Sequence, residues 1–207
     1  LLIICRSGGY YTLLNQNLIR STSGEATIAA SSKFIDNIIE INGNPATSSP
    51  RSFVVTSDGV FWADTLNKQI VQFKGGQSIS ASDYKAKRLF NRLFKRVESE
   101  GVQVQVTGGF SALSNEYLVG VPTPNPTTRA SLLTTTLENP LDFYYNKSYT
   151  YVFNSETNKW TSLIPKFREH ITLNNFTYAW DVAAQRVYSL IDNSGNPEFD
   201  SLIVIPF

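Results

Sequence analysis

The sequence predicts a mainly β protein of antiparallel hairpins and meanders, with one amphipathic helix at about residues 83–99. Its apolar runs are short, and turn-forming residues such as Gly, Asn, Asp and Pro separate them, which is typical of hairpin-connected strands. Only one stretch has apolar residues at helical spacing. With 207 residues, of which 42% are hydrophobic, the chain is long enough to bury a sizeable core.

The first predicted segment, residues 1–50, holds short strands and an irregular stretch. Residues 1–14 are apolar and aromatic around a Gly-Gly pair, which predicts two short strands and a turn. The Ser-, Thr- and Ala-rich residues 21–32 are expected to be irregular. Residues 34–41 suit a strand or one helical turn, and their many Ile residues favour the strand.

Residues 51–121 are predicted to form the first hairpin region, with the helix inside it. Ser57, Asp58 and Gly59 give a strong hairpin turn signal. Residues 107–110, Thr-Gly-Gly-Phe, are interpreted as another turn because of their Gly pair. The strands expected around these turns span residues 52–56, 60–63, 69–73, 102–106 and 116–121.

The helix prediction rests on apolar residues that share one face at helical spacing. They are Leu89, Phe90, Leu93, Phe94 and Val97. Ser80 or Ser82 offers an N-cap, and Asp83 and Gly101 suit the two ends. The apolar stripe predicts that the helix packs on its own domain.

Residues 122–140 are rich in Pro and Thr and are expected to form a long loop. The last segment, residues 141–207, is predicted to be a second hairpin region that ends with a turn at residues 193–197. Residues 192–200 have oxygen side chains at alternate positions, as calcium loops do. Pro197 interrupts them and the Gly is misplaced, which favours a plain hairpin turn.

One hairpin pattern occurs three times. Placing Asp64 over Asn154 and Asp181 aligns FWADTLNKQIVQF with YVFNSETNKWTSL and YAWDVAAQRVYSL without gaps. In each copy an aromatic residue lies three positions before the Asp or Asn, and apolar residues lie six and nine positions after it. The matched residues are Phe61, Tyr151 and Tyr178, then Ile70, Trp160 and Val187, then Phe73, Leu163 and Leu190.

Repeated antiparallel units with aromatic motifs are typical of β-propellers, so the fold is predicted to be partly β-propeller-like. We expect the aromatic residues, including Trp62, to lie in a shared or analogous core. The Asp or Asn is expected to open the turn by binding local backbone amides.

Composition excludes several classes of protein. With 18 Lys and Arg against 17 Asp and Glu, the net charge of +1 does not draw the chain onto nucleic acid or an anionic membrane. The longest apolar runs are far below the roughly 20 residues of a membrane-spanning helix. One Cys and one His exclude an internal disulfide framework and a multi-histidine metal site. The absence of Met and the strand-like last residues predict that the chain is part of a longer polypeptide.

No catalytic, cofactor-binding or metal-binding residue is predicted. No Gly-x-Ser-x-Gly elbow accompanies His170, which is expected to be a partly exposed loop residue beside Glu169. No glycine-rich phosphate loop is present.

The predicted helix concentrates positive charge, because six of the chain's 18 basic residues fall within residues 85–96. Arg88, Arg92 and Arg96 follow at i, i+4 and i+8, where like charges repel by roughly 0.2 to 0.5 kcal/mol per pair. Together with Lys95 they are candidate interaction residues for an acidic partner or DNA. The alternative is a solvated face whose C-terminal cations favour the helix dipole.

The order GGFSALSNEYLVGVP, a Thr-rich loop, then YTYVFNSETNKWTSLIPKF resembles large tail proteins of bacteriophages, especially those of crAss-like phages. The resemblance covers roughly residues 49–192. The matched residues are Gly108, Gly109, Phe110, Glu116, Tyr117, Phe153, Asn154, Trp160, Thr161 and Ser162.

This resemblance implies a non-enzymatic structural component of the virion tail, in a nozzle or muzzle around the genome exit channel. It also implies assembly with other tail subunits in a homo-oligomeric ring, contact with DNA in the channel and no cofactor. The alternative is a carbohydrate-binding or carbohydrate-active β-propeller that presents Trp62, Trp160 and Trp180 as aromatic platforms. Carboxylates about 5 to 9.5 Å apart in one pocket with them would favour a glycosidase.

Overall fold

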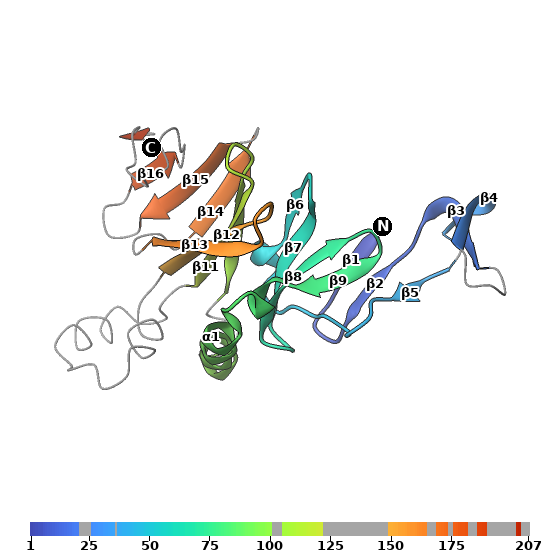
Figure 1. Cartoon of the computed structure of the whole chain (residues 1–207), viewed down its shortest axis with the longest axis horizontal. Helices are drawn as coiled ribbons and strands as arrows, with labels where there is room; N and C mark the ends of the chain where they lie inside the picture. Colours follow the sequence, from blue (N-terminus) through green and yellow to red (C-terminus); the bar gives the residue numbers. More distant parts are fainter. Residues whose placement is uncertain are drawn as a thin grey trace.

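The computed structural model describes residues 1–20, 26–35, 37–100, 105–121, 149–164, 169–173, 176–181, 186–189 and 202–203. Within these residues the chain forms antiparallel β-sheets with one α-helix, which confirms the predicted mainly β class (Figure 1). The loop predicted at residues 122–140 and the turn predicted at residues 193–197 lie outside the described residues.

Three four-stranded antiparallel sheets follow one another along the chain, and each is a meander whose strands pair in sequence order. The first sheet contains β6 (Val54–Thr56), β7 (Gly59–Asp64), β8 (Gln69–Lys74) and β9 (Gln77–Ser80). The second sheet contains β10 (Thr107–Ser111), β11 (Glu116–Val121), β12 (Tyr149–Asn154) and β13 (Lys159–Ile164). The third sheet contains β14 (Glu169–Leu173), β15 (Phe176–Asp181), β16 (Arg186–Ser189) and β17 (Leu202–Ile203).

The second sheet joins two of the predicted segments. Its strands β11 and β12 pair along their length, although residues 122–148 separate them in sequence. Residues 51–121 and 141–207 therefore contribute two strands each to one sheet.

The N-terminal region forms a three-stranded sheet of β1 (Leu2–Ile4), β2 (Gly9–Tyr11) and β5 (Ile39–Glu40). The two strands predicted within residues 1–14 are confirmed by β1 and β2. Tyr11 packs on Phe73 of the first sheet, with ring centroids 5.4 Å apart, so this sheet lies against the first sheet.

A hairpin of β3 (Leu14–Arg20) and β4 (Ala26–Ile35), here called the arm, pairs only with itself and projects from one end of the molecule (Figure 1). The expectation that residues 21–32 are irregular is wrong for residues 26–32, which lie in β4. Their small side chains suggested a loop, but pairing with the neighbouring β3 overrides this weak strand propensity.

The three sheets pack face to face in chain order. Phe61 of the first sheet stacks on Tyr117 of the second at 4.9 Å between ring centroids. The second and third sheets meet through a smaller buried cluster of Leu118, Val152 and Ala179. The first strand of the second sheet, β10, contacts both β6 and β14, the first strands of its neighbours.

Gly108 and Gly109 lie in the middle of strand β10, so the predicted turn at residues 107–110 is wrong. A Cβ at Gly108 would collide with the carbonyl oxygen of Ser52, and a Cβ at Gly109 would come within 2.9 Å of the Cβ of His170. The two glycines therefore allow close approach of a neighbour on each face of the sheet rather than a turn. The strand predicted at residues 102–106 does not extend through Gln105 and Val106, because β10 begins at Thr107.

The α-helix, α1 (Lys87–Glu100), begins four residues later than predicted. Residues Ala81–Asp83 form a 3-10 helix, and Lys85 has a φ of 69°, which interrupts the helical backbone. The Ser82 hydroxyl accepts a hydrogen bond from the amide of Ile70 at 2.6 Å instead of capping α1. The predicted apolar stripe is confirmed, since Phe90, Leu93, Phe94 and Val97 are buried and Leu89 packs against them. Within the described parts of the chain, no helix has the length and apolarity needed to cross a bilayer.

Candidate functional site

The repeated hairpins pair alike next to the turn, as the alignment predicts, and a bulge between Val152 and Phe153 shifts the second copy by one residue farther from the turn. Asp64 pairs with Gln69, Asn154 with Lys159 and Asp181 with Arg186. The fourth residue after the Asp or Asn has a left-handed backbone in the first two copies, with a φ of 57° at Lys68 and 53° at Asn158. The copies occupy different places in their sheets, because Asn154 links a third strand to a fourth whereas the others link a second to a third.

The Asp64 carboxylate organises its turn. It is fully buried, and one oxygen accepts hydrogen bonds from the amides of Asn67 at 3.0 Å and Ala46 at 3.1 Å. Its other oxygen accepts from the side-chain amides of Asn67 and Gln69. The expected bonding of the turn's own amides is thus confirmed, and the bond to Ala46 also ties the turn to the segment before the first sheet.

Asn154 plays the same part in the second copy, where its Oδ1 accepts a hydrogen bond from the amide of Thr157 at 2.8 Å. Its Nδ2 donates to the carbonyl of Ser114 in the neighbouring hairpin. Nothing is described of the Asp181 side chain, so this role stays a prediction there.

The aromatic residues of the repeat are less uniform than expected. Phe61 and Tyr151 are buried, whereas Tyr178 is only half-buried. Trp62 is buried on the opposite face of the first sheet, stacked on Phe53 at 6.0 Å. Trp160 packs on Phe90 of α1 at 4.6 Å.

The apolar positions follow the same trend. Ile70 lies in the core, and Val187 is half-buried in the third sheet. The Trp160 indole also donates a hydrogen bond to the carbonyl of Ala81 at 3.1 Å. Trp62 is therefore a buried packing residue, and Trp160 is partly buried between the second sheet and the helix.

A fourth hairpin of this type was missed by the sequence comparison. Ser111 pairs with Glu116, and Asn115 has a φ of 52°, as Lys68 and Asn158 do in their turns. The comparison missed it because Ser replaces Asp or Asn and a glycine, Gly108, takes the aromatic position.

His170 is buried in strand β14, which corrects the expected exposed loop position. Its ring lies over Thr107, Gly120 and Thr150, which are in register across three strands of the second sheet. Nδ1 is 3.3 Å from the Thr107 hydroxyl, and Nε2 is 3.0 Å from the Thr150 hydroxyl.

Burial lowers the pKa of His170 to about 4. The imidazole is therefore neutral at pH 7 and has one N–H donor and one acceptor nitrogen. One threonine hydroxyl accepts from the ring and the other donates to it. This arrangement satisfies the buried ring and links the third sheet to three strands of the second.

Further polar contacts cross between the sheets. The Tyr117 hydroxyl donates to the carbonyl of Ser52 at 2.6 Å, and burial raises the pKa of this phenol. Ser155 donates to Asp58 at 2.7 Å, and this hydrogen bond lowers the pKa of the Asp58 carboxyl. Arg51 pairs with Glu169 of the third sheet at 3.2 Å.

The predicted interaction residues on α1 do not share one exposure. Arg88 and Lys95 are exposed, Arg92 is half-buried and Arg96 is 3% exposed. The exposure of these three arginines therefore decreases along the helix, from Arg88 in solvent to Arg96 inside the protein. Only Arg88 and Lys95 of the predicted set are fully available to a partner.

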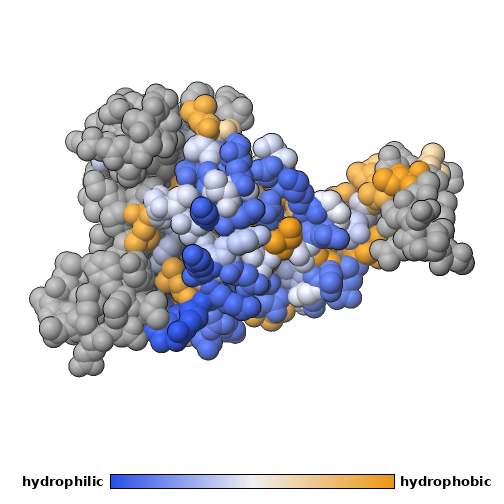
Figure 2. All heavy atoms as spheres, in the orientation of Figure 1, coloured by the Kyte–Doolittle hydropathy of each residue, from blue (hydrophilic) through white to orange (hydrophobic). Residues whose placement is uncertain are grey.

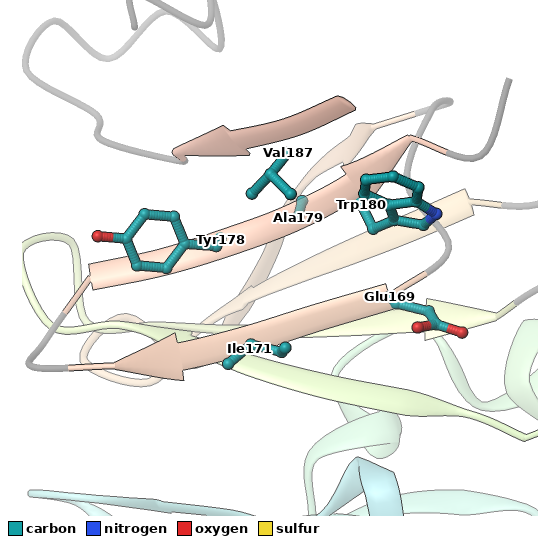
Figure 3. Close-up of a pocket in the computed structure, with 6 residues that line it drawn as sticks. All are labelled: Glu169, Ile171, Tyr178, Ala179, Trp180 and Val187. Carbon is teal, nitrogen blue, oxygen red and sulfur yellow. The ribbon is translucent and has the colours of Figure 1, made fainter. Parts of the chain in front are cut away.

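The third sheet has a shallow hollow of about 270 Å³ on the face that points away from the second sheet (Figure 3). Tyr178 and Trp180 stand on β15, with Ile171 on β14 and Val187 on β16, and Glu169 lies at one end. Trp180 thus borders this open hollow, while Trp62 is buried in the core and the partly buried Trp160 packs against it. Sequence reasoning missed the hollow, although the alternation in Tyr178-Ala179-Trp180 predicts two aromatic side chains on one face.

Among the described residues, no three His, Cys, Asp or Glu side chains are grouped closely enough to hold a metal ion. The calcium-like stretch at residues 192–200 lies outside the described residues. No protein-family model and no curated protein matches this chain, so no relative's function carries over to it.

Proposed function

We propose that this chain is a non-enzymatic structural component of a bacteriophage virion tail, in the nozzle or muzzle around the genome exit channel. The observation that supports the proposal is the structural role of the motif residues by which the sequence resembles crAss-like phage tail proteins. Gly108 and Gly109 allow close approach of neighbouring segments, Tyr117 stacks on Phe61 of the first sheet and Trp160 packs on the helix. These residues hold layers together, as expected of a protein that works through assembly.

The three sheets are proposed to be consecutive blades of a β-propeller-like unit. Propeller blades are four-stranded antiparallel sheets arranged radially. The meander order of each sheet and the contacts of β10 with β6 and β14 support this arrangement, because they bring first strands together.

The proposed partners are other tail subunits in a homo-oligomeric ring, with DNA or an acidic protein surface at helix α1. Arg88 and Lys95 are exposed and can contact such a partner. Lys87 is paired with Asp83 at 3.1 Å, and both side chains are largely exposed, so this pair contributes little to stability.

A carbohydrate-binding protein is the second candidate, and the hollow beside Tyr178 and Trp180 favours it. Sugar rings stack on exposed aromatic faces, and Glu169 offers a carboxylate at one end. Against it, Trp62 is buried in the core, Trp160 packs against the core, and the hollow is smaller than the roughly 300 to 1,000 Å³ of typical small-molecule pockets.

The first test is the double variant Arg88→Gln with Lys95→Gln, with the exposed Lys159→Gln as a control for the loss of positive charge. Particle assembly and genome delivery are measured across a salt series. We expect the double variant to weaken assembly or delivery and to reduce their salt dependence, because screening acts on the attraction that has been removed. Full activity of the double variant at every salt concentration would contradict a role for the helix.

The second test separates the two candidate functions. Trp180→Ala is assayed for binding and hydrolysis of polysaccharides by purified particles. Specific binding that this variant abolishes, with assembly unchanged, would favour the carbohydrate-binding protein over the structural component.

A further inference from the structure

The outer face of the third sheet, defined by Ile171, Leu173, Tyr178, Trp180 and Val187, is apolar and lacks a covering layer among the described residues. Ile171 is 57% exposed and Leu173 is 59% exposed. Side chains of this size on one face form a contiguous apolar surface, which in a protein marks a contact site.

The other two four-stranded sheets are covered on both faces. In the first sheet, Phe61 is buried on one face, and Trp62 and Val71 are buried on the other. In the second sheet, Tyr117 faces the first sheet and Leu118 faces the third. The outer face is therefore an interruption in a regular series of packed layers.

The arm also has exposed apolar residues, because its hairpin does not pack on any sheet among the described residues. Ile28 is 57% exposed and Phe34 is 63% exposed, and Ile35 is also exposed. Hydrophobic residues gather on the arm in Figure 2. A two-stranded hairpin alone is at best marginally stable in water, so the arm needs a surface to bind.

We propose that the arm of one copy packs on the outer face of a second copy, in a head-to-tail contact. The proposal deepens the assembly role proposed above by naming both contact surfaces. The arm and the third sheet lie at opposite ends of the molecule, so one copy cannot satisfy both surfaces by itself (Figure 1). Each copy then gives an arm to one neighbour and receives an arm from another.

The dimensions and chemistry of the two surfaces are compatible. The strands of the arm have 7 and 10 residues, so at about 3.3 Å per residue they are longer than the 5- and 6-residue strands β14 and β15. Glu169 is already paired with Arg51, which leaves an apolar lining in the hollow. An Ile or Phe side chain of the arm suits this lining better than a cation.

Head-to-tail contacts between two different surfaces repeat from copy to copy. They close into a ring when the rotation between copies fits, and otherwise form an open filament. This outcome differs from an arm-to-arm contact, which would stop at a dimer.

The test uses two variants of the chain with intact layers. The arm variant carries Ile28→Glu and Phe34→Glu, and the face variant carries Ile171→Glu and Leu173→Glu. All four side chains are more than half exposed, so the substitutions should leave folding nearly unchanged. The matched control is Leu113→Glu, at an exposed leucine in the β10 to β11 turn.

Association is measured by sedimentation over a concentration series. We expect the parent and the control to form assemblies larger than a dimer, and each variant alone to associate about tenfold more weakly or not at all. An equimolar mixture of the two variants should form a dimer and nothing larger, because it keeps one intact arm and one intact face.

Two outcomes overturn the inference. If the face variant assembles like the parent, the arm binds elsewhere, and the assembly role stands without this contact. If the parent stays monomeric at all concentrations, both the contact and self-assembly by this chain fail.

Disulfide trapping provides a check that does not depend on the stability of the Glu variants. Chains with Cys5→Ser and either Phe34→Cys or Ile171→Cys are mixed and oxidised. A cross-linked pair that contains one chain of each kind supports the contact, and cross-linking only between like chains contradicts it.

Discussion

The imidazole of His170 lies directly against Gly120, so that a Cβ at residue 120 would come within 3.0 Å of the ring atoms Cε1 and Nδ1. The ring of His170 in the third sheet therefore limits the side chain that residue 120 of the second sheet can have, and Gly120 in turn leaves room for the ring. Neither position tolerates a larger side chain unless the sheets move apart.

Replacing Gly120 by Ala is expected to lower the free energy of unfolding by about 1 to 3 kcal/mol, because the new Cβ collides with the Thr107 hydroxyl of the neighbouring strand and presses on the His170 ring of the third sheet. Part of this loss should vanish in a His170→Ala background, which removes the ring. Denaturant unfolding of the two single variants and the double variant measures this coupling. Strictly additive effects would show that the two residues do not press on each other.

The stability of the chain should fall as the pH drops from about 6.5 to about 4. In this window the unfolded chain protonates His170, whereas the buried imidazole, with a pKa of about 4, stays neutral. The difference between the ordinary histidine pKa of 6.5 and about 4 corresponds to about 3 to 4 kcal/mol at most. Unfolding measured across this range should have a shallower pH dependence in His170→Gln than in the parent, and equal slopes would refute a buried neutral imidazole.

Asp64→Ala should destabilise the chain more than Asn154→Ala does. The Asp64 carboxylate is buried and accepts four hydrogen bonds, and its loss leaves the buried amide of Ala46 unpaired at about 1 to 3 kcal/mol, whereas the other three donors are partly open to water. Asn154 is only partly buried, and the amide of Thr157 that it binds is exposed to water. Thermal unfolding of both variants gives the comparison. An equal or smaller loss of stability in Asp64→Ala would contradict the role of this carboxylate in organising its turn.

Arg96→Gln should lower stability by more than 1 kcal/mol, because Arg96 is only 3% exposed and the substitution removes the packing of its long side chain. Arg88→Gln, on the exposed face of the same helix, should stay within about ±0.5 kcal/mol. Denaturant unfolding of the two variants distinguishes a buried from a solvated arginine. Equal changes in the free energy of unfolding would indicate that Arg96 is solvent-exposed, as Arg88 is.

The hairpins could be predicted because the residues that determine their turns lie close together in the sequence. The register of the turn after Asp64 depends on residues within six positions, which the alignment compares directly. The apolar stripe of α1 was predictable for the same reason, since its residues lie within three turns of one helix.

The Gly108 and Gly109 pair was misinterpreted because glycine serves both turns and close approach. Which use applies depends on Ser52 and His170, more than fifty residues away in sequence. The burial of His170 and Arg96 also depends on layers that fold over them from elsewhere in the chain. These features need the tertiary arrangement, which the sequence pattern does not contain.

Gly108 of β10 and the helix α1 lie at opposite edges of the first and second sheets. At the β10 edge the missing side chain of Gly108 lets Ser52 approach the strand, whereas at the other edge α1 contacts β8 and carries Phe90 against Tyr151 and Trp160. The gap between the first and second sheets is therefore a wedge, narrow at one edge and wide at the other. Two sheets separated by a wedge are inclined to each other, and Gly108 lies on the narrow side. A side chain at Gly108 would open this narrow side and reduce the inclination.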